Sequence, residues 1–306
     1  MELTWLMRIR IAAAMGAGML LIGLAAWPLV APAVPGGAIT IQAGDISVLD
    51  VVIVAALAFA AGFLAYFAAW PYGSDIAVLA APAGLALWAV RSGSMSDLLR
   101  MNMGLSAEET IAMRQDLFFI MRWEGLLWLA VAAAGYAGVR LAAGIIPAGK
   151  PVNDAEIGNT NTRNPLNIMT ALIASVVIGS FAMGIFAQDV RMFDSELGSV
   201  IGQPGKAQIG FAVVVSFGIA AFVAKRLLDV SWIVPALASG AVAFYGIWLS
   251  AKRDVLEHMV ESWPEAFFAR SVCAVLPIQF AAFGAIGAVI GYWSAIKYAH
   301  WRKHGE

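Results

Sequence analysis

The chain has 306 residues, of which 61% are hydrophobic and 13% are charged, whereas soluble domains carry about 25% charged residues. With a mean hydropathy of +0.81, the chain has too few polar side chains to cover a water-soluble core, so the composition predicts an integral membrane protein. The 19 basic and 20 acidic residues give a net charge of −1, which excludes a basic surface for nucleic acid. The single cysteine, Cys273, excludes an intramolecular disulfide.

A helix needs about 20 apolar residues to cross roughly 30 Å of hydrocarbon. Eight segments predict such helices: Ile11 to Val30, Val48 to Trp70, Ile76 to Val90, Trp123 to Ile146, Ile168 to Ala187, Ile209 to Ala224, Val230 to Leu249 and Ser271 to Ile296. The third segment has only 15 residues between Asp75 and Arg91, or about 22 Å of helix, so it either spans a thinned bilayer or is re-entrant. The expected fold is an all-α, polytopic helical membrane protein.

The first segment has two interpretations. Arg8 and Arg10 precede an apolar run that ends near Ala31-Pro32-Ala33, a pattern that resembles a cleaved signal peptide. The run is longer than the about 7 to 15 apolar residues of such peptides, which favours a retained span. Basic pairs directly flank the spans, and this predicts a cell-membrane protein with both termini in the cytoplasm. These pairs are Arg8 with Arg10, Lys225 with Arg226, and Arg302 with Lys303.

Loop lengths follow a long, short, long order in each half of the chain and indicate a four-plus-four repeat. A Ser-x-x-Glu pattern, which predicts the start of a helix, occurs in both third loops, at Ser106 to Glu109 and at Ser262 to Glu265. A Phe pair and an arginine follow each pattern, Phe118-Phe119 with Arg122 and Phe267-Phe268 with Arg270. Accidental similarity between Ala-rich apolar sequences is the alternative. The repeat predicts two parallel halves, 1–150 and 168–306, joined by a polar, Asn-rich linker at 151–167.

Ionisable residues deep in a bilayer are costly and usually functional, and the predicted spans contain almost none. The charged residues Arg122, Glu124, Arg140, Arg270 and Lys297 lie near span ends, where long side chains can reach water. The deep polar residues Gln279, Ser175 and Ser216 either bond neighbouring helices or line a pathway for a polar solute. No cofactor or metal is expected, because all three histidines lie outside the spans.

The loops after the third and seventh segments hold the one polar concentration that predicts a site. Its residues are Asp97, Arg100, Arg122, Asp254, His258 and Arg270. They predict a docking face for a partner protein or for lipid headgroups. The alternative is a pair of interfacial helices whose apolar residues Met95, Leu98, Leu99 and Leu105 rest on lipid. A third interpretation is headgroup catalysis, with His258 as a base beside a carboxylate.

The motifs resemble those of no family that we recognise. Scarce deep charge favours a non-catalytic multi-pass protein, a scaffold or subunit of a membrane complex, over an enzyme. Its expected partners are the lipid bilayer and other membrane proteins or a second copy, without nucleic acid. Transport of a neutral or lipidic solute between the halves is the alternative function. The Gly287-to-Gly291 GxxxG motif predicts close helix packing, either within the chain or between two copies.

Overall fold

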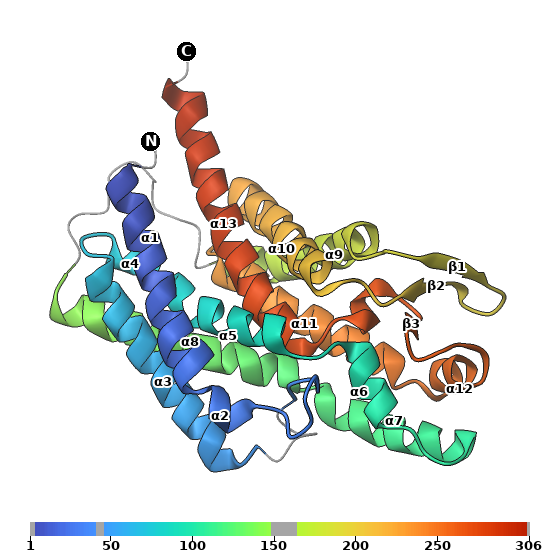
Figure 1. Cartoon of the computed structure of the whole chain (residues 1–306). Coiled ribbons are helices and arrows are strands. Elements are labelled where there is room, and N and C mark those ends of the chain that lie inside the picture. The colour runs from blue at the N-terminus through green and yellow to red at the C-terminus, as the bar shows by residue number, and fades with distance from the viewer. Residues whose placement is uncertain (1–3, 41–45, 148–163, 305–306) are drawn as a thin grey trace.

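A computed structural model describes residues 4–40, 46–147 and 164–304 (Figure 1). Its eight long apolar helices confirm the all-α, polytopic membrane fold. The spans are α1 Trp5–Gly18 with η1 Met19–Ala25, α3 Val48–Ala68, α4 Gly73–Ile76 with η2 Ala77–Leu79 and α5 Ala80–Arg91, α8 Glu124–Ile145, α9 Pro165–Phe186, α10 Lys206–Leu228, α11 Ile233–Ser250 and α13 Pro277–His304. Shorter elements are α2 Trp27–Val30, α6 Met95–Met101, α7 Ala107–Met121, α12 Arg253–Ser262, η4 Ser271–Ala274, β1 Arg191–Asp194, β2 Gly198–Gly202 and β3 Phe267–Phe268.

Contacts between loops show which helix ends share a face of the bundle. The Arg10 guanidinium lies 5.7 Å from the Tyr72 ring centre, so the start of α1 and the loop after α3 are on one face. We call this the terminal face, because both chain ends lie there (Figure 1). On the opposite face, the Gly93 N–H donates to the Gly37 carbonyl at 2.9 Å. Segments 91–123, 187–205 and 251–276 gather on that side, and we call them the cap.

Most span boundaries differ from the predicted ones by a few residues; the first span, for example, begins at Trp5 instead of Ile11. The third span consists of α4, η2 and α5, has 19 residues instead of 15, and is mostly buried among other helices. The last span begins at Pro277 instead of Ser271, and Ser271–Ala274 forms a separate 3₁₀ turn. Proline suits the first position of a helix, since the N–H that it lacks would have no intrahelical acceptor.

Glycines bring the backbones of two helix pairs into direct contact. A Cβ atom placed on Gly62 of α3 would lie 1.9 Å from the Gly135 carbonyl oxygen of α8. A Cβ atom on Gly291 of α13 would lie 2.0 Å from the Gly218 oxygen of α10. The GxxxG motif of α13 therefore packs against α10 within one chain, as small residues at helix crossings do.

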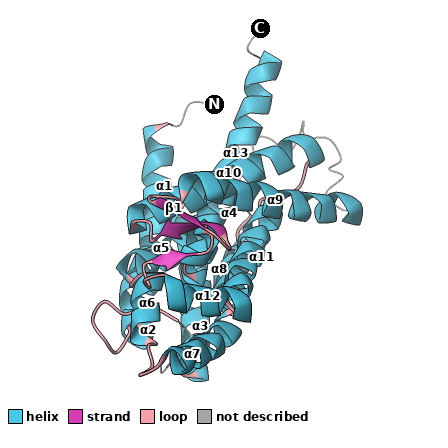
Figure 2. Ribbon diagram, turned by 90° about the vertical axis from the view of Figure 1, so that its right-hand side faces the viewer, coloured by secondary structure: helices cyan, strands magenta, loops and turns pink. Residues whose placement is uncertain are grey.

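A small sheet in the cap was not expected from the sequence (Figure 2). The strands pair antiparallel in the order β1-β2-β3, with Ile201 opposite Phe268. The prediction that Ser262 begins a helix is wrong, because α12 ends at Ser262 and the Phe pair forms β3. Backbone pairing with β2, a contact distant in sequence, overrides the local cap preference. Ser106 does cap α7, since its hydroxyl oxygen accepts from the Glu109 N–H at 3.2 Å.

Candidate functional site

The cap lies at the end of the bundle opposite the terminal face and is built by both halves of the chain. Helices α7 and α8 together cover 39 residues, more than the about 20 residues that a span requires. Helix α7 and the β1–β2 hairpin extend from the same end of the bundle (Figure 1). Helix α12 packs against α7 and lies between α7 and the hairpin (Figure 1).

Gln203 connects the two halves within the cap through two hydrogen bonds. Its Oε1 accepts from the Ser96 N–H of α6 at 3.1 Å, and its Nε2 donates to the Ala274 carbonyl at 3.0 Å. One amide side chain thus bonds the backbones of both third loops. A single glutamine in a loop offers no sequence signal, so sequence analysis missed this contact.

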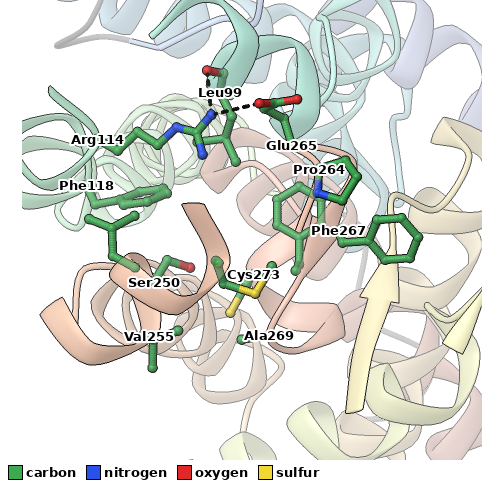
Figure 3. Close-up of a pocket in the computed structure, with 13 residues that line it drawn as sticks. Leu99, Arg114, Phe118, Ser250, Val255, Pro264, Glu265, Phe267, Ala269 and Cys273 are labelled. Atoms are coloured by element: carbon green, nitrogen blue, oxygen red, sulfur yellow. Dashed lines mark hydrogen bonds and ion pairs between the residues drawn. The ribbon is translucent and has the colours of Figure 1, made fainter. Parts of the chain in front are cut away.

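A second link between the halves joins Arg114 of α7 to Glu265 (Figure 3). Arg114 is 4% exposed; its Nη2 donates to the Leu99 carbonyl at 3.3 Å and lies 3.6 Å from Glu265 Oε1. Burial lowers the pKa of Arg114, and Glu265 opposes that shift. The pair borders a cavity of about 30 Å³ lined mainly by apolar side chains, including Phe118 and Met259. This volume holds one or two water molecules rather than a solute or an acyl chain.

Glu265→Gln is expected to destabilise the protein by about 1–3 kcal/mol, because it removes the carboxylate beside a buried guanidinium. Unfolding in mixed detergent micelles measures the loss. Glu257→Gln is the matched control, since Glu257 pairs with Arg253, whose side chain is 77% exposed, and exposed pairs contribute roughly 0–1 kcal/mol. Equal losses of stability in both variants would contradict a stabilising role for the Arg114–Glu265 pair.

His258 joins α12 to the hairpin through two carboxylates. Its Nε2 lies 2.8 Å from Asp194 Oδ2, and its Nδ1 lies 3.2 Å from Glu196 Oε2. Asp194 also accepts from Trp263 Nε1 at 2.7 Å and from the Leu197 N–H at 2.6 Å. The Leu197 N–H and then His258 hold the pKa of Asp194 far below its usual range, and Asp194 raises the pKa of His258.

The surroundings of His258 do not suit a general base. A general base needs a ring nitrogen that is free to take a proton, whereas both nitrogens of His258 face carboxylates. Both carboxylates, Asp194 and Glu196, come from the hairpin and are distant from His258 in sequence. The cluster is therefore arranged as an electrostatic link between α12 and the hairpin.

The other residues of the predicted docking face do not converge. Asp97 caps its own helix, since its Oδ2 accepts from the Ser94 N–H at 2.8 Å. The Arg122 guanidinium stacks 3.9 Å from the Phe119 ring centre. Arg100, Asp254 and Arg270 have exposed side chains. Of the six predicted residues, only His258 takes part in the cluster with the hairpin, which sequence analysis did not foresee.

The expectation of apolar cap residues resting on lipid is wrong for three of the four. Met95, Leu98 and Leu99 are 0%, 4% and 6% exposed and belong to the protein core. Leu105 is fully exposed. Phe193 in the hairpin is 82% exposed. Sequence analysis did not single it out, because the hairpin was not predicted. Leu105 precedes α7 and Phe193 lies in β1, two elements that extend from the end of the bundle (Figure 1).

The three predicted intramembrane polar residues lie on three different helices. Gln279 lies in the first turn of α13, and its Oε1 accepts from the Leu276 N–H at 2.9 Å. Ser175 of α9 and Ser216 of α10 are buried, and their hydroxyls have no hydrogen-bond partner within the described residues. Glu124, expected to reach water from a span end, is instead completely buried.

Comparisons with known proteins add no functional information. The chain matches no protein family, no curated protein and no solved structure. Its function is therefore argued from the geometry of the cap and the spans.

Proposed function

We propose that this protein is a non-catalytic subunit or scaffold of a membrane complex, and that its cap docks a partner protein. The observation that carries the proposal is the exposure of Leu105 and Phe193 on a cap that both halves hold together. Large apolar side chains gain roughly 1.5–3 kcal/mol each when they leave water. A docking partner would supply that burial, because Leu105 and Phe193 belong to the end of the bundle from which α7 and the hairpin extend (Figure 1).

Replacing Leu105 and Phe193 together by serine is expected to remove a partner that copurifies with the wild type from native membranes in mild detergent. Quantitative mass spectrometry compares the partner's yield, and thermal unfolding verifies that the variant is folded. Val34→Ser is the matched control, because Val34 is 53% exposed on a different loop. A wild type that purifies as a stable monomer with nothing bound would contradict the proposal.

Transport of a neutral or lipidic solute stays the alternative function. The buried hydroxyls of Ser175 and Ser216 favour it, because buried polar groups without partners are unusual in membrane helices. They lie on α9 and α10, two neighbouring helices. Gln279 does not support the pathway, since its Oε1 already accepts from the N–H of Leu276, the residue that precedes α13.

The helix packing supports the internal repeat as a further part of this proposal. Helix α3 packs on α8 in the first half, and α10 packs on α13 at the matching positions of the second. Helices α1 and α9 likewise pack on α5 and α11, the third spans of their halves. Spans four positions apart in the chain run in the same direction, as two halves related by an axis along the membrane normal require.

We also propose that the terminal face is cytoplasmic. Basic side chains outnumber acidic ones on that face of the described structure, and acidic side chains outnumber basic ones on the cap. The basic residues of the terminal face are Arg8, Arg10, Arg140, Lys225, Arg226, Lys297 and Arg302. An excess of Lys and Arg next to span ends favours the cytoplasmic side.

A further inference from the structure

The outer edge of the cap sheet is a strand whose backbone is available for pairing. Strand β1 lies at the edge of the sheet. The Gly202 N–H donates to the Val190 carbonyl at 2.8 Å, and hydrogen-bonded pairs alternate along an antiparallel ladder. Met192 therefore bonds to β2, whereas the N–H and C=O groups of Arg191 and Phe193 point to the free edge.

This edge carries apolar side chains and few of the features that block pairing. Phe193 is 82% exposed and Met192 is 46% exposed. Natural edge strands usually avoid pairing through proline, bulges or charged side chains. Among these devices, the four residues of β1 include only the charged side chains of Arg191 and Asp194, and Asp194 is already paired with His258. An extended segment that added a strand here would bond the two outward residues and cover the Phe193 ring.

The charges around β1 indicate which kind of segment fits. Asp189 precedes the strand, and Glu196, whose side chain is 68% exposed, follows it. Glu261 of α12 is close enough to His258 to act on it electrostatically. When the Asp194–His258 pair is set aside, three acidic side chains, those of Asp189, Glu196 and Glu261, accompany the one basic side chain of β1, Arg191. A second copy of this edge would bring like charges together, which is unfavourable in paired strands.

We propose that the free edge of β1 binds an extended, basic segment of a partner protein by strand addition. Main-chain hydrogen bonds to Arg191 and Phe193 supply the pairing, an apolar side chain of the partner contacts Phe193, and Lys or Arg side chains lie near Asp189 and Glu196. This inference rests on the proposed docking function and names the chemistry of the partner.

The test uses the full chain in lipid nanodiscs and two synthetic seven-residue peptides, one alternating lysine with valine and one alternating glutamate with valine. The basic peptide is expected to bind and the acidic one is not. Phe193→Pro removes an outward N–H and should weaken binding by roughly tenfold or more. Phe193→Thr is the matched control, because it loses the same ring contact but keeps that N–H and suits a strand; the weakening in Phe193→Pro beyond that in Phe193→Thr measures the outward hydrogen bond.

Hydrogen exchange in the wild type provides a second test that needs no variant. Binding of the basic peptide should slow exchange at the amides of Arg191 and Phe193, while the amide of Met192, already bonded to β2, should change little. Uniform protection along β1, or equal binding by the proline and threonine variants, would overturn strand addition. A wild-type dimer that Phe193→Pro dissociates would overturn it in favour of self-association.

Failure of strand addition can be distinguished from failure of the proposed docking function. If the peptide fails to bind but the Leu105 and Phe193 serine variant still loses its copurifying partner, the docking function stands and strand addition falls. If the wild type also purifies alone, both proposals fail.

Discussion

Gly62→Ala and Gly291→Ala are each expected to destabilise the protein by about 3 kcal/mol or more, because overpacking a tight contact forces backbones apart. The new methyl groups would lie 1.9 Å and 2.0 Å from the carbonyl oxygens of Gly135 and Gly218. These distances are far inside van der Waals contact, and the obstacle is backbone rather than a flexible side chain. Unfolding in mixed micelles measures the change.

Gly184→Ala is the control for the glycine prediction. A Cβ atom on Gly184 of α9 would meet no atom within 4 Å, so alanine there should be neutral or stabilising by up to about 1 kcal/mol. Similar losses at Gly62 and Gly291 would agree with equivalent packing in the two halves. A loss at Gly184 as large as at Gly291 would show that helix contact is not the cause.

Docking of the hairpin onto α12 is expected to depend on pH in two directions. The pKa of His258 is raised above 6.5 in the folded protein, so its contribution is complete below about pH 6.5 and is lost as pH rises through the folded pKa. The pKa of Asp194 is lowered from 3.8, so its contribution is present above about pH 4 and is lost as pH falls through the folded pKa. Docking should therefore be strongest between these limits.

Hydrogen exchange at the indole N–H of Trp263, which follows α12 and donates to Asp194 of the hairpin, measures this docking after correction for the intrinsic effect of pH on exchange. For each unit by which the pKa of His258 in the folded protein exceeds 6.5, the equilibrium constant for docking is about tenfold larger at low pH than at high pH. His258→Gln should remove the upper pH dependence and keep part of the lower one, since the Leu197 N–H still lowers the pKa of Asp194. An unaltered profile in that variant would contradict the role of His258.

Sequence patterns predicted the spans well because a helix is a local structure in lipid, where the backbone can bond only within its own segment. Composition and span length were enough to place eight helices, although Pro277 moved the last start by six residues. The helix start expected at Ser262 failed because the Phe pair bonds to β2, and that pairing joins segments more than 60 residues apart. Local capping preference is weaker than a sheet partner that tertiary structure supplies.

The sequence by itself determined the membrane class, the number of helices and the concentration of polar residues in the third loops, since each depends on composition or local spacing. Only the tertiary structure decided what those polar residues do. It buried Arg114 beside Glu265, engaged both nitrogens of His258 with carboxylates from the hairpin, and left Phe193 in water on a free strand edge. These contacts join residues distant along the chain, and no periodicity encodes which of them will meet.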